Sequence, residues 1–418
     1  MATRKVPALD GAGKINEKHI PDRLSDGALS AAIEKSASSW IDSRGIDVSS
    51  KPPADDTPVI AWSEAPATEL TSPVVYKPSI CGKGSQVLNW DGRDDPNIRY
   101  FSGVYQTFNG ANADMTLVGS TKPGGTSQAA TWPLVFAFNT YAAAIELYIY
   151  SARAAHSMMV EVNGRMVSDT LYRQPGDQVA VWCRVKINFP SKAYGSPRQI
   201  RIWADGAFGL AEIRVPSGET ITKPTATVGR RAGIIADSFV NGAGASNSWP
   251  NQGTSNLETF APRLLRMMGA SDMVLAGIGG TGFVSGGDTS SYKTRVAAVV
   301  ATAPDVLFFL ASVNDGSAAG TIQSEVEATL ALAASVPKVY VIGTLLSGYA
   351  DNRAAVKAGT LAAGRTFIDL GAFLTGTGNI GLPKGDGNRD YLLMTDNVHP
   401  TLDAHRAIAR KLFVALNA

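Results

Sequence analysis

The feature that most constrains the fold is a regular alternation of two patterns over residues 230–418. Short apolar runs with β character occur at 232–237, 272–278, 305–312, 338–346 and 366–370. Helical patterns alternate with them at 257–269, 291–303, 321–335, 351–364 and 401–417. The runs lack polar alternation, which is typical of strands covered on both faces of a sheet. Five such repeats predict a doubly wound α/β domain whose parallel sheet binds ligands at the carboxyl ends of its strands.

Residues 73–220 have a different pattern, with many short runs rich in β-branched and aromatic residues. The pairs Asn163-Gly164 and Asp205-Gly206 stand between such runs and predict tight hairpins. This region is therefore predicted to be an all-β sandwich of jelly-roll type. Three aromatic residues of this region are interpreted as core residues, with a sugar-binding platform as the alternative: Tyr148, Trp182 and Trp203. Residues 217–229 resemble a linker.

Residues 1–72 form a polar leader broken by Pro and Gly. Apolar spacing over 25–43, with Ser25 or Asp26 as N-cap, predicts one amphipathic helix. An isolated helix of this length is marginally stable, so we expect it to pack on another surface or on its own copies. Residues 52–66 resemble a linker.

The composition excludes several classes of protein. Lys and Arg number 38 and Asp and Glu 36, and this near balance argues against nucleic acid as the main partner. No run is long and apolar enough for a membrane span. The first residues lack the apolar segment of a secretory signal, so delivery outside a cell would need another route. Cys81 and Cys183 are interpreted as buried thiols, with one disulfide as the alternative, and they cannot supply a four-cysteine zinc site.

Candidate catalytic residues lie where predicted strands end. Ser238 follows the first strand and precedes a turn that contains Gly242, the position of an exposed nucleophile, although such serines commonly only cap helices. Of the four histidines, His19 and His156 lie outside this domain, and His405 is expected on the solvated face of the last helix. His399 instead follows Asp396 by three residues in the preceding loop, which lets the carboxylate orient Nδ1 and leaves Nε2 as a base. A loop aspartate that caps a helix is the alternative reading of this pair.

Two further segments provide hydrogen-bond donors at the same edge. The glycines of 277–283 allow a backbone N–H to approach a substrate, and Asn314 follows the third strand. Each pattern alone is common in turns. Their convergence with Ser238 and His399 on one sheet edge favours an acyl-transfer site.

At these residues the domain resembles the SGNH (GDSL-type) hydrolase superfamily. Its G-D-S block matches Ala236-Asp237-Ser238 with Ala for Gly, and its G-x-N-D block matches Ser312-Val313-Asn314-Asp315 with Ser for Gly. Its D-x-x-H block matches Asp396–His399 fully, and its second-block glycine matches Gly280, with Gly279 as the alternative. The resemblance implies a flavodoxin-like three-layer domain and an esterase without cofactor or metal. Ser238 would be the nucleophile, His399 the base and Asp396 its orienter, and the oxyanion would be held by Ser238, Gly280 and Asn314.

The leader, at 8–15 and 19–24, resembles the leaders of bacteriophage tail and fibre proteins. This implies a trimeric protein of the virion that works with other tail proteins and deacetylates a host-envelope glycan. The alternatives are a catalytically silent receptor-binding tail protein and a cellular lipase or thioesterase.

Overall fold

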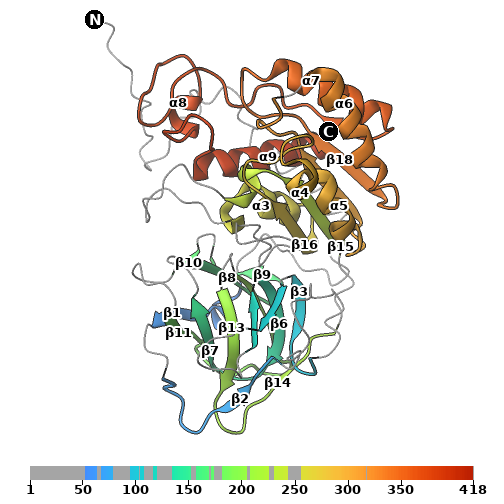
Figure 1. Ribbon diagram of the computed structural model, residues 1–418. Helices are drawn as coiled ribbons and strands as arrows, with labels where there is room; N and C mark the ends of the chain where they lie inside the picture. The colour runs from blue at the N-terminus through green and yellow to red at the C-terminus, as the bar shows by residue number, and fades with distance from the viewer. Residues whose placement is uncertain are drawn as a thin grey trace, which may run out of the picture.

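The computed structural model describes residues 52–417 apart from 64–66, 79–94, 103, 108–115, 120–133, 152–156, 169–170, 174–180, 205–207, 226–229, 243–255 and 317. The molecule has two parts, with antiparallel sheets below and a parallel sheet among helices above (Figure 1). The leader with its predicted helix at 25–43, the turn Asp205-Gly206 and Cys81 lie outside the described residues. The prediction that Cys81 and Cys183 are separate thiols therefore stays a prediction.

The upper part contains the predicted parallel sheet. Its five strands are β15 (Arg230–Ala236), β16 (Ala270–Gly277), β17 (Val306–Leu310), β18 (Lys338–Ile342) and β19 (Thr366–Ile368). They pair in the order β16-β15-β17-β18-β19, and every pair is parallel. This is the flavodoxin-like order, with a topological switch point where β15 lies between β16 and β17. The carboxyl end of β15 is thus the expected place for a ligand.

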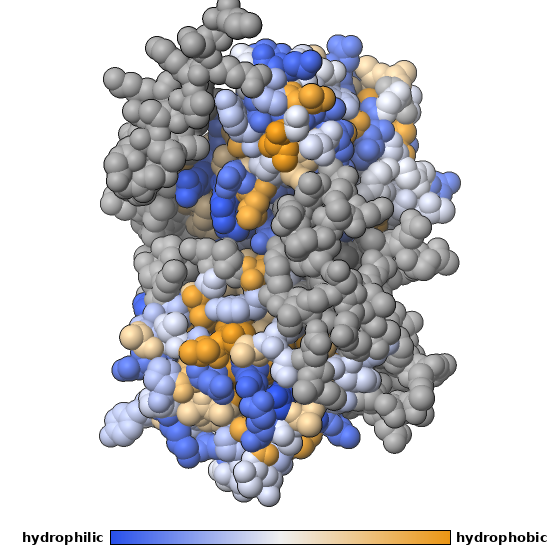
Figure 2. Space-filling model, turned by 90° about the vertical axis from the view of Figure 1, so that its left-hand side faces the viewer, coloured by the Kyte–Doolittle hydropathy of each residue, from blue (hydrophilic) through white to orange (hydrophobic). Residues whose placement is uncertain are grey.

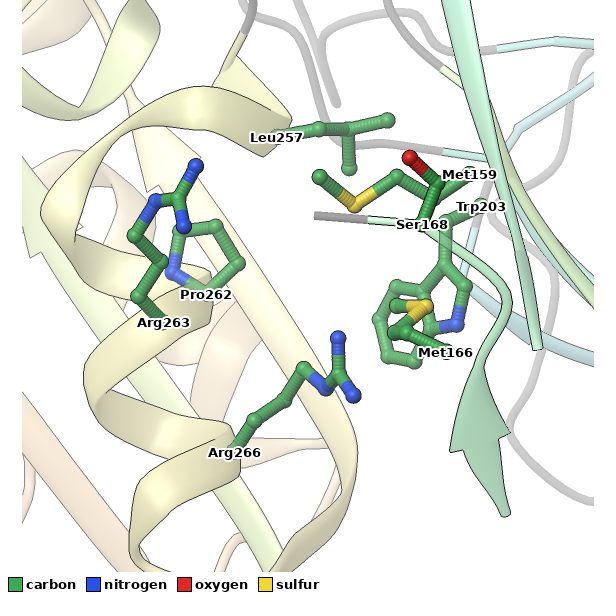
Figure 3. A pocket seen from close by; sticks show the side chains of 8 residues that line it. All are labelled: Met159, Met166, Ser168, Trp203, Leu257, Pro262, Arg263 and Arg266. Atoms are coloured by element: carbon green, nitrogen blue, oxygen red, sulfur yellow. The ribbon is translucent and has the colours of Figure 1, made fainter. Parts of the chain in front are cut away.

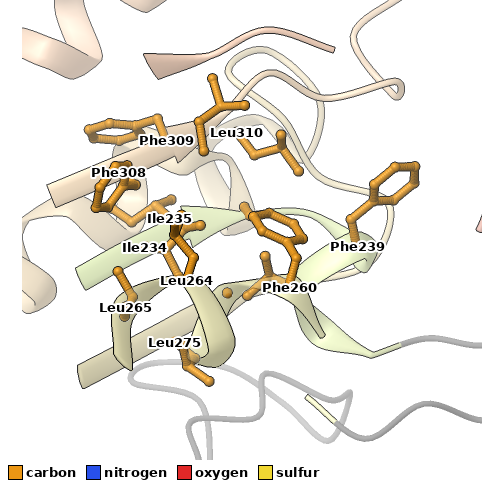
Figure 4. Close-up of a cluster of buried hydrophobic side chains, with 14 of the residues drawn as sticks. Ile234, Ile235, Phe239, Phe260, Leu264, Leu265, Leu275, Phe308, Phe309 and Leu310 are labelled. Carbon is orange, nitrogen blue, oxygen red and sulfur yellow. The ribbon is translucent and has the colours of Figure 1, made fainter. Parts of the chain in front are cut away.

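Helices of this part alternate with the strands, as the sequence pattern predicts. They are α2 (Ser238–Asn241), η3 (Asn256–Glu258), α3 (Phe260–Met267), α4 (Gly287–Ser290), α5 (Tyr292–Val300), α6 (Ala319–Ala331), α7 (Ala350–Ala362), α8 (Arg389–Leu392) and α9 (Leu402–Asn417). All five residues of β17 are buried, as are the last five of β15, because layers of side chains cover both faces of the sheet. Figure 4 shows Ile234, Phe308 and Leu264 meeting in this core.

The lower part consists of two seven-stranded antiparallel sheets. The first contains β1 (Val59–Ser63), β11 (Val181–Asn188), β7 (Ala144–Ser151), β13 (Phe208–Val215), β5 (Thr116–Gly119), β4 (Val104–Thr107) and β2 (Val74–Tyr76). The second contains β10 (Tyr172–Arg173), β8 (Ser157–Val162), β12 (Arg198–Ala204), β6 (Leu134–Thr140), β14 (Ile221–Thr222), β3 (Arg99–Ser102) and β9 (Arg165–Met166). Alternate residues of both sheets, such as Leu147 and Ile202, share one buried cluster.

Two segments predicted as linkers belong to these sheets. Within 52–66, β1 pairs with β11, and a short 3-10 helix, η2 (Ala54–Asp56), precedes it. Within 217–229, β14 pairs with β6. Both strands are short and lie at sheet edges, so they lack the apolar run by which a central strand is recognised. The Asn163-Gly164 turn is present as predicted: both residues have positive φ and join β8 to β9.

The two parts share a hydrophobic cluster. Phe101, Met159 and Trp203 of the antiparallel sheets belong to the same buried cluster as β15 and α3. Trp203 is 2% exposed, which agrees with its interpretation as a core residue. A small cavity opens at this boundary, with Met166 and Trp203 on one wall and Arg263 and Arg266 of α3 on the other (Figure 3).

On the face drawn in Figure 2, hydrophobic residues stand among polar ones in both parts of the molecule. Among the described residues, no helix has the length and apolar character needed to cross a membrane.

Candidate active site

Ser238 is the first residue of α2, separated from the end of β15 by Asp237 alone, and is 6% exposed. Asp237 is the N-cap of this helix and accepts a hydrogen bond from the N–H of Phe239 at 2.9 Å. Gly277 lets α2 pack directly on the end of β16, because a Cβ there would lie 2.5 Å from the backbone N of Asn241. The glycine thus fixes the turn that carries Ser238.

Asp396 and His399 form a hydrogen-bonded pair in the loop before α9. The Nδ1 atom of His399 lies 2.5 Å from Asp396 Oδ2. Asp396 Oδ1 accepts from the N–H groups of Val398 and His399, both at 3.0 Å. Asn397 takes a positive φ of 63°, which folds the segment back so that these bonds can form. The D-x-x-H motif therefore builds the local geometry that the sequence predicts.

The environment keeps Asp396 ionised. Partial burial alone would raise the pKa of Asp396, but the bonds from the His399 ring and from the N–H groups of Val398 and His399 outweigh it. The net effect is a pKa below the usual value for an aspartate. An ionised Oδ2 only accepts, so the proton between the two groups belongs on His399 Nδ1, and Nε2 is the ring nitrogen that faces away from Asp396.

His399 lies beside the helix that begins at Ser238. Its ring centroid is 6.1 Å from that of Phe239, the next residue after Ser238. Within the described part of the chain, His399 Nε2 is buried and has no hydrogen-bond partner. The structure therefore brings a basic nitrogen without a partner next to the turn that carries the serine.

The glycine loop after β16 lies against Ser238. A Cβ added to Gly279 would be 3.7 Å from Ser238 Cβ, whereas one added to Gly280 would meet no atom within 4 Å. Gly280 has a φ of +74°, a conformation that favours glycine. Both glycines are exposed, so their backbones face open space beside the serine.

Asn314 lies at the end of β17 and is held by hydrogen bonds from its amide. Its Nδ2 donates to Thr281 O at 3.1 Å and to Ser312 Oγ at 3.0 Å. Ser312 Oγ also lies 2.8 Å from Asp237 Oδ2.

Burial raises the pKa of Asp237, although the bonds from the Phe239 N–H and the Ser312 hydroxyl lower it in part. Four sequence-predicted elements thus meet at one edge of the sheet.

Asp315 organises the loop that follows the glycines. Its carboxylate accepts from the N–H groups of Phe283, Val284 and Ser285 at 2.8–3.0 Å. A Cβ on Gly282 would lie 2.1 Å from Asp315 Oδ1, so only glycine permits this approach. This role was not predicted, although Asp315 stands inside the G-x-N-D match.

His405 differs from the expectation of a solvated position, because it is 2% exposed. Its Nδ1 accepts a hydrogen bond from the N–H of Phe260 at 3.3 Å, and its ring stacks on the Phe260 ring. α3 packs on this face of α9, which the pattern of the helix alone does not reveal. Burial, reinforced by the charges of Arg263 and His399, lowers the pKa of His405 to about 3, so this imidazole is neutral near pH 7.

The interpretation of Tyr148 and Trp182 as core residues is wrong: they stack on the outer side of the first antiparallel sheet, with ring centroids 4.8 Å apart, and both are half-buried. In the described ranges, no three His, Cys, Asp or Glu side chains are placed to hold a metal ion.

Comparison with solved structures identifies proteins of the same architecture. The acetyl xylan esterase Est2A from Butyrivibrio proteoclasticus has a TM-score of 0.50 at 14% identity, over 83% of this chain and 98% of that chain. A family two carbohydrate esterase from Clostridium thermocellum, solved with cellohexaose, has a TM-score of 0.51 at 12% identity, over 76% and 98%. The salicylyl-acyltransferase SsfX3 from a tetracycline biosynthetic pathway has a TM-score of 0.53 at 13% identity, over 80% and 96%.

What is shared is the fold. At these identities the alignments establish the architecture over most of the chain, and not the activity. Family models and curated protein sequences give no match.

Proposed function

We propose that this chain is a serine esterase of SGNH type that removes acetyl groups from a glycan. The observation that carries the proposal is the Asp396–His399 pair, whose Nε2 is buried without a partner among described atoms, beside the turn of Ser238. The fold shared with two carbohydrate esterases supports it.

In the proposed reaction, Ser238 Oγ attacks the ester carbonyl carbon while His399 Nε2 takes the hydroxyl proton. The carbonyl oxygen becomes an oxyanion, held by the backbone N–H groups of Ser238 and Gly280 and by the Asn314 amide. The intermediate then collapses, the bond to the sugar oxygen breaks, and His399 returns the proton to that oxygen. Water, deprotonated by the same histidine, then attacks the acyl carbon, the bond to Ser238 Oγ breaks, and His399 returns the proton to that oxygen as acetate leaves. Asp396 stays ionised throughout and keeps the Nδ1 proton in place.

The substrate and setting are the finer part of the proposal. We infer a host-envelope glycan as substrate, a jelly-roll-like arrangement of the two antiparallel sheets that binds carbohydrate, and a trimer carried on a phage tail with other tail proteins. The support for the phage setting is the resemblance of the leader at 8–24. Sedimentation of the full chain would test the trimer: a mass three times that of the chain is expected, and a monomer would contradict it.

The decisive experiment measures hydrolysis of p-nitrophenyl acetate by the wild type and by Ser238→Ala. The wild type is expected to turn over the ester and Ser238→Ala to lose at least about 10³-fold in kcat. Ser324→Ala is the matched control, because this α6 hydroxyl bonds only to Thr321 O in its own helix and should leave kcat unchanged.

The same assay separates the alternatives. If wild type and Ser238→Ala are equally inert on p-nitrophenyl acetate and on acetylated glycans, the catalytically silent binding protein is favoured. If esters of long acyl chains are hydrolysed much faster than acetyl esters, the lipase or thioesterase alternative is favoured.

A further inference from the structure

Ser312 occupies the place where the resembled family has glycine, and its hydroxyl lies at the centre of a buried network. The residue is fully buried. Its Oγ lies 2.8 Å from Asp237 Oδ2 and 2.7 Å from Thr281 O, and both the N–H and the Nδ2 of Asn314 donate to it at 3.0 Å. One hydroxyl thus links the ends of β15, β16 and β17.

This network leaves one N–H of the Asn314 amide unused. Thr281 O and Ser312 Oγ, the two acceptors of Nδ2, are only 2.7 Å apart. The two N–H bonds of a planar amide diverge widely, so two acceptors that lie this close together share a single N–H of Asn314 Nδ2. The amide is therefore fixed in rotation, and its second N–H points away from Ser312 and Thr281.

Arg295 of α5 anchors the other end of the network. Its guanidinium donates to Thr281 Oγ1 at 2.9 Å and to the carbonyls of Ala236 and Ala276 at 3.0 and 2.5 Å. Ala236 and Ala276 are at the ends of the strands that lead to Ser238 and to the glycine loop. Arg295 is 7% exposed, and burial lowers the pKa of its side chain to about 10. Burial of the Arg295 charge is possible because its guanidinium has three hydrogen-bond acceptors. One of them belongs to Thr281, whose carbonyl accepts from the Asn314 amide.

We propose that Ser312 and Arg295 are positioning residues: Ser312 with Thr281 sets the direction of the Asn314 amide, and Arg295 fixes Thr281 and the two strand ends. The inference rests on the proposed function, because it assigns these residues to the donor that would hold the oxyanion. Neither residue touches the reacting atoms. Both act through Asn314 and the loops on either side of Ser238.

A double-mutant cycle on p-nitrophenyl acetate hydrolysis tests the role of Ser312. Ser312→Ala is expected to lower kcat by at least about 10-fold with KM changed less than about 3-fold, since loss of one oxyanion donor costs about 10²–10³-fold. In the Asn314→Ala background the same change should cost less than about 3-fold, because the amide it orients is gone. Equal losses in both backgrounds, or no loss in either, would overturn the inference. Ser312→Gly carries the residue of the resembled family and repeats the cycle if Ser312→Ala does not fold.

Arg295→Lys tests the anchor, with Arg353→Lys as its matched control. Arg353 also binds backbone carbonyls at a strand end, those of Thr344 and Leu346 after β18, but it does not contact this network. Both variants should lower the melting temperature, while only Arg295→Lys should lower kcat, by at least about 10-fold. An equal kcat in Arg295→Lys and Arg353→Lys would contradict the anchor.

A readout without catalysis separates this inference from the proposed function. In the wild type, NMR of the Asn314 side-chain amide should show one proton that exchanges slowly and one that exchanges fast. Ser312→Ala should make both exchange fast. If the wild type hydrolyses no ester but the amide behaves in this way, the proposed function fails and the positioning stands. If the wild type is active but Ser312→Ala leaves the exchange of both amide protons unchanged, the positioning role is contradicted and the proposed function stands.

Discussion

Asp396 Oδ2 accepts a hydrogen bond from His399 Nδ1, 2.5 Å away, while Asp396 Oδ1 accepts from two backbone N–H groups of the same loop. The carboxylate therefore has one orientation, and so does the imidazole. The loop itself is closed by the hydrogen bond from the Met394 N–H to His399 O at 2.8 Å. The bonds that orient Asp396 and His399 all lie within residues 394–399, which explains why so short a motif can specify them, and Asn379 and Arg389 hold the loop from outside by donating to Asn397.

Asp396→Asn tests the orienting role of this carboxylate. An amide in that place can present its NH₂ to Nδ1, which favours the tautomer with the proton on Nε2 and removes the base. We expect kcat on p-nitrophenyl acetate to fall by roughly 10²–10⁴-fold. Asp403→Asn on the exposed start of α9 is the control and should have no effect, since its partner is the surface residue Arg406. Wild-type kcat in Asp396→Asn would contradict the assignment.

The lowered pKa of Asp396 also sets a direction for the pH dependence of stability. The folded-state pKa lies below that of the unfolded chain, so the unfolded state binds the proton first as the pH falls. The contribution of Asp396 to the unfolding free energy is present above roughly pH 4 and is lost as the pH falls through the folded-state pKa. Asp396→Asn should show a flatter dependence in this acidic range.

Gly279→Ala and Gly280→Ala distinguish the two glycines beside Ser238. A methyl group on Gly279 makes ordinary contacts with the Ser238 and Asn241 side chains, so thermal stability should hardly change. That methyl occupies space next to the nucleophile, and kcat should fall by at least about 10-fold. Gly280→Ala meets no atom but places alanine at a φ of +74°, which costs about 1–2 kcal/mol. Melting temperature and kcat of both variants check this, and full activity in Gly279→Ala would contradict the geometry.

The sequence predicted the parts of this molecule that depend on local pattern. The strands β15 and β17 are covered on both faces of the sheet, and this burial is visible in the sequence as uninterrupted apolar runs. Asp396 and His399 lie within four residues of each other, so their pairing is also a local pattern. Ser238 and Asn314 could be placed because parallel strands bring their carboxyl ends to one edge. These predictions needed only the order of elements and the type of residue at each strand end.

Contacts between distant segments were beyond such reasoning. His405 looked solvated because its burial comes from Phe260, which lies 145 residues away in the chain. Arg295 sits in an ordinary helical pattern, and nothing in that pattern indicates that it binds two carbonyls of β15 and β16 and the hydroxyl of Thr281 in the loop after β16. The sequence held one hint of the buried network around Asn314, namely Ser312, a polar residue where the resembled family has glycine.

His405→Asn tests the buried neutral imidazole. Because the folded-state pKa is about 3 and the unfolded one about 6.5, only the unfolded chain binds this proton between those pH values. The wild type should lose unfolding free energy as the pH falls through that window, by up to about 1.4 kcal/mol per pH unit from this group. Asparagine keeps an acceptor for the Phe260 N–H and has no such proton. Urea unfolding from pH 7 to pH 4 should show a smaller loss in His405→Asn, and parallel curves would rule out the assignment.

Tyr391 tests where a long substrate extends from the proposed site. This residue of α8 is 63% exposed, and Leu393, two residues further on, pairs with Pro400, the residue after His399. An aromatic face near the Asp396–His399 loop offers a stacking surface for a sugar ring, worth about 0.5–1.5 kcal/mol. Tyr391→Ala should therefore raise KM for an O-acetylated envelope glycan roughly 2- to 10-fold and leave p-nitrophenyl acetate hydrolysis unchanged, because the small ester has no sugar ring to stack on the tyrosine. Leu361→Ala, at an exposed apolar residue near the end of α7, is the control, because it lies in neither the proposed site nor the antiparallel part. If KM for the polymer is the same in Tyr391→Ala and the wild type, the glycan leaves the site by another path.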